Sequence, residues 1–164
     1  MKPTNILVNE HRIIEQVLNC LERMVERCDA EGRLEAIPAR EAISFFRAFA
    51  ECAHLAKEEA HLFPLVAGTT CPQGCRPSEL MAREDQHGHA HLQAMEEAIE
   101  GAAAGEKDSV KRFVQHGQQY ITLLMKYIEN EEDWLFPQVS LTFTRILTSP
   151  PLLHRRRTAM SIRE

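Results

Sequence analysis

The sequence lacks a long apolar run and an excess of positive charge. Nowhere do about eighteen apolar residues follow one another without a charge, so we expect no membrane-spanning helix. The formal net charge is −5, which disfavours nucleic acid and anionic membranes as partners because both need a basic surface. The first residues also lack the apolar segment of a secretory signal peptide, so we expect a cytoplasmic protein.

Cysteines are few, and their odd number does not fit a disulfide scaffold. The five are Cys20, Cys28, Cys52, Cys71 and Cys75. We expect them to be reduced. Cys71 and Cys75 share a loop but lack the second pair that a structural zinc site needs, so we interpret them as a flexible thiol pair. A redox switch is the alternative.

Hydrophobic residues make up 44% of the 164 residues and charged residues 26%, which is ordinary for a globular protein with a packed core. The length suits a single domain. We place this domain at residues 1–147. The remaining residues, 148–164, include the basic run Arg155–Arg157 and are expected to form a flexible tail.

Four segments have the spacing of apolar residues that is typical of amphipathic helices. They run from Thr4 to Asp29, from Pro38 to before Gly68, from the predicted cap Ser78 to before Gly101, and from the predicted cap Asp108 to about Pro137. Four helices joined by short loops predict an all-α fold, an up-down-up-down four-helix bundle.

The second and fourth segments contain a repeat. Residues 54–64 align without gaps with residues 127–137, at an offset of 73, and share Glu-Glu and Leu-Phe-Pro. In the first and third segments, Glu10-His11 aligns with Glu84-Asp85 at an offset of 74. The chain therefore resembles two copies of a helix pair, which predicts a bundle with an internal pseudo-twofold axis.

Polar side chains of the metal-ligand type lie on the inner face of each predicted helix. They are His11, His54, Glu58, Asp85, Tyr127 and Glu131. Residues four apart share one helix face, so the second and fourth helices each present a pair of ligands. Mixed nitrogen and oxygen ligands suit iron or manganese, and helical bundles are known to hold dinuclear centres. We therefore predict a metal centre in the core.

The segment from Glu10 to Glu15 and both Glu-Glu-x-x-Leu-Phe-Pro motifs resemble the hemerythrin-like (HHE cation-binding) family over roughly residues 5–139. The family pattern has a histidine on the first helix, His-x-x-x-Glu on the second, a histidine on the third and His-x-x-x-Glu on the fourth. Four residues match this pattern directly: His11, His54, Glu58 and Glu131.

Two residues depart from the family pattern, since Asp85 and Tyr127 stand where it has histidines. His89 follows Asp85 by four residues and is a further candidate ligand, with His87 as the alternative. Both replacements are hard oxygen ligands, which favour ferric over ferrous iron. Tyr127 is either an iron ligand or a core residue whose hydroxyl bonds to a neighbour.

Four further glutamates and histidines near the candidate ligands are not expected to bind the metal. Glu59 and Glu132 point about 100° away around their helices, so we expect them to be solvated or to contact the ligands from outside. His61 and His116 are expected to make hydrogen bonds away from the centre.

The resemblance implies two iron ions, oxo- or hydroxo-bridged, that meet a small oxidant such as hydrogen peroxide, dioxygen or nitric oxide. A ferric-biased site fits catalase-like peroxide disproportionation or oxidative-stress sensing better than reversible oxygen carriage. The alternative is an iron-dependent regulatory or interaction module without turnover, in which metal binding stabilises the fold. A metal-free adaptor is disfavoured because it would bury carboxylates with nothing to neutralise them.

Overall fold

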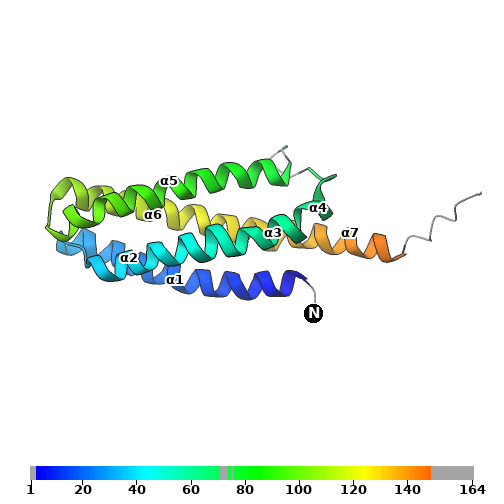
Figure 1. Cartoon of the computed structure of the whole chain (residues 1–164), viewed down its shortest axis with the longest axis horizontal. Coiled ribbons are helices and arrows are strands. Elements are labelled where there is room, and N and C mark those ends of the chain that lie inside the picture. Colours follow the sequence, from blue (N-terminus) through cyan, green and yellow to red (C-terminus); the bar gives the residue numbers. More distant parts are fainter. Residues whose placement is uncertain (1–2, 71–73, 75, 149–164) are drawn as a thin grey trace, which may run out of the picture.

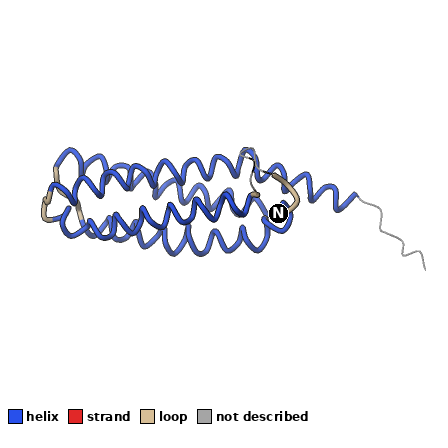
Figure 2. The backbone as a smooth tube through the Cα atoms, turned by 90° about the horizontal axis from the view of Figure 1, so that it is seen from above, coloured by secondary structure: helices blue, strands red, loops and turns tan. Residues whose placement is uncertain are grey.

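In the computed structural model, the described residues are 3–70, 74 and 76–148, and they are helical apart from short connections (Figure 2). The elements, with η marking a π-helix, are α1 (Pro3–Glu31), α2 (Ala36–Phe45), η1 (Phe46–His54), α3 (Leu55–His61), α4 (Phe63–Val66), α5 (Pro77–Ala103), α6 (Lys107–Asn130), η2 (Glu131–Leu135) and α7 (Phe136–Thr148). The described part contains no strand, so the prediction of an all-α fold is confirmed.

The long helical stretches lie side by side along the long axis of the molecule, whereas the short α4 turns away from this axis at one end (Figure 1). α2, η1 and α3 follow one another directly, and so do α6, η2 and α7. α5 packs against α6, α6 against α1, and α2 against α5. α7 continues past the other helices at one end (Figure 1).

All four predicted helices begin earlier than predicted, and for the third and fourth the difference changes the role of the predicted cap. The third begins at Pro77, which leaves Ser78 inside the first turn rather than at the cap. Proline is favoured there because its fixed φ suits the helix and its missing N–H would have no partner. The fourth begins at Lys107, so Asp108 lies in the first turn, where its charge still suits the helix dipole.

Two buried apolar clusters fill the interior. The larger includes Ile14, Phe46 and Phe113, and the smaller includes Leu7 and Leu135. On α1 the two clusters are about two helical turns apart, since Leu7 belongs to the smaller and Ile14 to the larger. The polar residue between them on this face, His11, therefore lies where the two apolar clusters meet.

α6 approaches α1 closely at Gly117. A Cβ atom at this position would lie 2.5 Å from Val25 Cγ2, which is far inside van der Waals contact. Because glycine has no Cβ, it permits the approach that buries both helix faces.

Several sequence predictions fall outside the described residues, namely those on Cys71, Cys75 and the tail that follows α7. Of the remaining cysteines, Cys28 is buried whereas Cys20 and Cys52 are exposed, and all three are free thiols. Within the described ranges, no helix is long and apolar enough to span a bilayer.

Candidate metal centre

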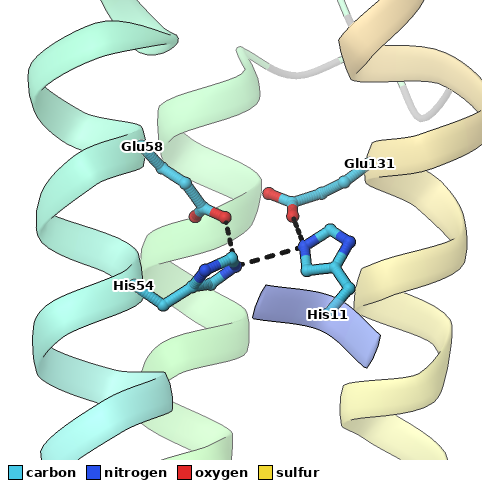
Figure 3. A group of neighbouring side chains, drawn as sticks. All are labelled: His11, His54, Glu58 and Glu131. Carbon is cyan, nitrogen blue, oxygen red and sulfur yellow. Dashed lines mark hydrogen bonds and ion pairs between the residues drawn. The ribbon is translucent and has the colours of Figure 1, made fainter. Parts of the chain in front are cut away.

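Four buried side chains from α1, η1, α3 and η2 converge in the core (Figure 3). They are His11 on α1, His54 at the end of η1, Glu58 on α3 and Glu131 at the start of η2. Each offers one ligand atom, and these atoms all lie within 4.8 Å of one another. All four residues are at most 4% exposed. Burial of so many ionisable groups is costly unless their charges are compensated.

The two π-helical stretches position two of these ligands, because His54 ends η1 and Glu131 begins η2. A π-helix has a wider turn than an α-helix, so it rotates the residues that follow it around the axis, and such stretches are frequent at functional sites. Pro137 follows η2 and has no backbone N–H, which favours a break in the regular α-helical pattern before it.

The two imidazole rings face each other through their Nε2 atoms, which are 3.1 Å apart. Glu131 Oε2 lies 3.1 Å from the Nε2 atom of His11. Glu58 Oε1 lies 2.8 Å from the Nε2 atom of His54. Two nitrogen and two oxygen atoms therefore point towards one small volume.

The other nitrogen of each ring contacts a carboxylate. His11 Nδ1 lies 2.9 Å from Glu132 Oε1, and His54 Nδ1 lies 2.9 Å from Glu10 Oε2. Because a carboxylate only accepts hydrogen bonds, each Nδ1 carries the proton, and a neutral ring then directs the lone pair of Nε2 at the centre. Two facing lone pairs repel each other, whereas a cation between them would bind both. Carboxylates behind metal-binding histidines commonly fix this tautomer.

Each outer carboxylate is itself paired with a cation. Arg12 Nη2 lies 2.9 Å from Glu132 Oε2, and the Lys57 ammonium contacts Glu10. Burial alone would raise the pKa of Glu10, but Lys57 and His54 outweigh burial and lower this pKa. The same order of cation, carboxylate and imidazole therefore occurs on both sides of the centre.

The two ligand histidines differ in their affinity for a proton. Burial lowers the pKa of His11, and the carboxylate of Glu132 only partly offsets this effect. Burial acts in the same direction on His54, but the carboxylates of Glu58 and Glu10 outweigh it and raise its pKa. The negative groups that favour a proton on His54 also favour a metal cation in its place.

Tyr127 and Asp85 lie next to this cluster. The Tyr127 hydroxyl donates a hydrogen bond of 2.9 Å to Glu58 Oε2. Burial, together with the nearby charges of Glu131 and Glu58, holds the pKa of this phenol well above its usual value, so it is a neutral donor. Asp85 is half-buried and lines a cavity of about 40 Å³ together with Tyr127, His54 and Glu58.

The structure does not bring His89 to the centre. Its ring is exposed, and its Nδ1 atom lies 3.3 Å from Glu51 Oε2. His87 is exposed as well. The inward direction of α5 is set by Gly88 and Leu92, which are both buried, and this leaves His89 at the edge of the helix face.

Sequence reasoning missed one contact of the centre and placed another correctly as an outer contact. Glu10 directly precedes His11 and was assigned only to the internal repeat and the family motif, although it bonds to His54 on another helix. Glu132 contacts His11 from outside, whereas Glu59, at the equivalent position of the repeat, is exposed. The two glutamates differ because α1 lies beside Glu132 and not beside Glu59. A local sequence repeat does not indicate which of its copies another helix approaches.

The family model described as hemerythrin HHE cation binding domain matches residues 2–139. No curated protein and no solved structure matches the chain.

Proposed function

Because the chain belongs to the hemerythrin HHE cation-binding domain family, we propose that its buried cluster holds a non-haem iron pair that reacts with or senses a small oxidant. The family and the His–Glu cluster together indicate a metal-binding protein. The observation that carries the proposal is the pair of facing Nε2 atoms, 3.1 Å apart, whose rings are oriented by outer carboxylates. This mixture of imidazole and carboxylate donors fits iron.

We assign one ion to the histidine side of the cluster. His11 and His54 would supply its nitrogen ligands, and Glu58 and Glu131 would supply oxygen ligands on the opposite side. Each carboxylate has a second oxygen, so Glu58 and Glu131 are also the residues able to bridge to a second ion.

We assign the second ion to the side of the cluster that faces the cavity. Asp85 and Tyr127 would supply oxygen donors there, since both line the cavity and Tyr127 donates a hydrogen bond to Glu58. Loss of the Tyr127 proton requires a cation, because burial and the neighbouring carboxylates otherwise keep the phenol neutral. We leave His89 out of this set because it is exposed and contacts Glu51. The pair would be oxo- or hydroxo-bridged, as expected for adjacent ferric ions.

The cavity limits what reaches the centre. Its volume of about 40 Å³ is enough for one or a few water-sized molecules. Apolar side chains, including Ile14, Leu124 and Ile128, form much of its wall, which admits small neutral molecules and restricts water. Hydrogen peroxide, dioxygen and nitric oxide satisfy this limit.

An iron pair supplies two redox equivalents for exchange with such a molecule. The oxygen-rich side formed by Asp85 and Tyr127 favours the ferric state. We therefore favour catalase-like disproportionation, in which two molecules of hydrogen peroxide give two of water and one of dioxygen, or oxidant sensing, over reversible oxygen carriage.

We also interpret the helices as an up-down-up-down four-helix bundle with an internal pseudo-twofold axis. In the repeat, Tyr127 is the counterpart of His54, and Glu131 is the counterpart of Glu58. The hydrogen bond from Tyr127 to Glu58 and the shared cluster of Glu58 with Glu131 support this pairing.

The visible absorption spectrum of the iron-loaded, air-oxidised protein tests the proposal. We expect about two iron ions per chain and a broad visible band from phenolate bound to ferric iron, which Tyr127→Phe removes at equal iron content. Tyr120→Phe is the matched control, because Tyr120 lines the same cavity but is not a proposed ligand, and it should keep the band. Peroxide consumption by the wild-type protein is measured in parallel.

Each of the other outcomes would overturn a different part of the proposal. If the wild-type chain retains no iron, the proposal is wrong. If iron is retained but the spectra of wild type and Tyr127→Phe coincide, Tyr127 serves only as a hydrogen-bond donor to Glu58. If iron raises the melting temperature without any peroxide consumption, the regulatory module replaces the enzyme.

A further inference from the structure

A second group of histidines lies on α5 and α6, away from the buried centre. His91 on α5 and His116 on α6 are half-buried, and their Nδ1 atoms are 2.9 Å apart. Their ring centroids are 5.2 Å apart and their planes are inclined by 49°. The proposed iron chemistry uses neither residue.

Whether the two rings form a hydrogen bond depends on which of their nitrogens carry protons. A neutral imidazole has one N–H, so the contact is a hydrogen bond only when one of the two Nδ1 atoms carries a proton and the other does not. When both Nδ1 atoms are unprotonated, two lone pairs converge on one point at the surface. A cation bound there would use both.

The spacing is close to that of a metal site. Zinc binds imidazole nitrogen at about 2.0–2.1 Å in a tetrahedral arrangement, which places two ligand nitrogens roughly 3.3 Å apart. The observed separation of 2.9 Å therefore has to increase by only a few tenths of an ångström. Rotation of two half-buried side chains is sufficient for this change.

A third histidine lies on the same face of α5. His87 precedes His91 by four residues, so the two side chains are neighbours on the helix surface. Burial lowers the pKa of His91, and the nearness of His116 and His87 lowers it further. His87 and His91 line one surface hollow, which Gln119 also lines and which could receive a hydrated cation.

One feature of the hollow opposes cation binding. Lys126 lines it as well, and its positive charge lowers the local concentration of cations. Hard, strongly hydrated cations such as Mg²⁺ and Ca²⁺ prefer oxygen ligands, which this group of histidines does not provide. Late transition metals bind imidazole strongly enough to tolerate a nearby lysine.

We propose that His91 and His116 form a surface site for a divalent late transition metal such as Zn²⁺ or Cu²⁺, with His87 one turn away on the same face of α5. Water molecules complete its coordination. The site is separate from the buried cluster and does not depend on the iron chemistry proposed for that cluster.

Isothermal titration of Zn²⁺ into untagged, iron-loaded, full-length protein tests the site. We expect one equivalent of Zn²⁺ to bind to the wild type while the iron content stays constant. His91→Gln and His116→Gln should each weaken this binding at least roughly tenfold, because loss of a direct ligand costs no less than loss of an outer partner. His87→Gln should weaken it less.

His89→Gln is the matched control. His89 is on the same helix but is exposed and contacts Glu51, so its replacement should leave Zn²⁺ binding unchanged. Circular dichroism melts establish that the variants are folded. Electron paramagnetic resonance of the Cu²⁺-loaded wild type adds a reading that needs no variant, since coupling to two or more nitrogens is expected.

Two results would overturn the site. One is the absence of any Zn²⁺ binding to iron-loaded wild type, and the other is equal affinity in wild type and both glutamine variants. In either case retained iron would leave the proposed function of the buried cluster intact. If the protein retained no iron but still bound Zn²⁺, the surface site would stand and the proposed function of the buried cluster would be wrong.

Discussion

The tautomer of His11 depends on a single carboxylate. Glu132 accepts a hydrogen bond from the Nδ1 atom of His11, and Arg12 holds the same carboxylate from the solvent side. This arrangement leaves Nε2 as a lone-pair donor to the centre without placing Glu132 among the ligands. The basicity of the ring, and with it the affinity for metal, therefore depends on a residue near the surface.

We expect Glu132→Gln to weaken iron binding by about 10- to 100-fold, the usual cost of losing the partner behind a metal-binding histidine. The amide removes the negative charge and no longer fixes the tautomer of His11. Competition with a chelator of known affinity measures the change. Glu129→Gln is the control, because Glu129 is exposed on the preceding turn and should bind iron as the wild type does. Equal affinities of the two variants would show that the outer carboxylate has no such role.

The cysteines should differ in reactivity. Cys28 is 1% exposed and burial raises the pKa of its thiol, whereas Cys20 and Cys52 are exposed. Since the thiolate is the nucleophile, we expect iodoacetamide at neutral pH to modify the exposed pair at least roughly tenfold faster than Cys28. Peptide mapping by mass spectrometry resolves each site. Fast labelling of Cys28 in folded protein would indicate that α1 opens locally.

Residue spacing was sufficient to predict part of the site. His54 and Glu58 share a helix face because they are four residues apart, and the structure places both in the cluster. The position of His89 could not be decided in this way, because it follows Asp85 by the same spacing yet contacts Glu51 at the surface. The rotation of α5 decides between them, and that rotation depends on packing.

At the scale of elements, the sequence predicted where the helices lie but not their internal hydrogen bonding. The first helix was expected from Thr4 to Asp29 and spans Pro3–Glu31. The π-helical stretches η1 and η2 were not predicted, because the change from i→i+4 to i→i+5 bonding has no composition of its own. Only the repeated Leu-Phe-Pro motifs marked places where the α pattern changes, near α4 and after η2.

Two glycines inside helices allow a direct test of helix packing. We expect Gly117→Ala to destabilise the fold by about 1–3 kcal/mol, because its Cβ would lie 2.5 Å from the Cγ2 atom of buried Val25. Val25 is β-branched and has little rotational freedom to move aside. The gain in helix propensity does not offset such an overlap.

Gly88→Ala is the matched control for this substitution. Its Cβ would meet Tyr120 at 3.6 Å and Leu123 at 3.8 Å, which is ordinary contact. We expect stabilisation by about 0.5–1 kcal/mol, since alanine is the better helix former. Urea unfolding of both variants at constant iron content measures the two free energies, and a common sign would contradict this view of the α1–α6 contact.

At the scale of the whole molecule, the sequence predicted the all-α class and the family, and the family model confirms the resemblance over residues 2–139. The internal repeat made this prediction easier, because one set of spacings explained two helix pairs. The sequence predicted a polar group in the core, but not that two apolar clusters meet around it. The spacing shows which residues point inward but not how closely their helices approach.

Because of where the cluster lies, we expect the stability of the whole molecule to depend on metal. Glu58 and Glu131 are buried between the two apolar clusters, where uncompensated negative charge is costly. A ligand present at 100 times its dissociation constant stabilises the folded state by about 2.7 kcal/mol. For a chain of this size we expect chelation of the metal to lower the melting temperature by roughly 5–10 °C.

Glu58→Gln separates this effect from general salt or chelator effects. The substitution removes one buried charge and one proposed bridging ligand but keeps the size of the side chain. We therefore expect the metal-free variant to melt at or above the temperature of the metal-free wild type, whereas iron should no longer raise its melting temperature. Differential scanning calorimetry of both proteins, with and without iron, gives the four temperatures. If chelation left the wild-type melting temperature unchanged, the buried carboxylates would have to be neutralised by protons instead, with His54 holding one of them.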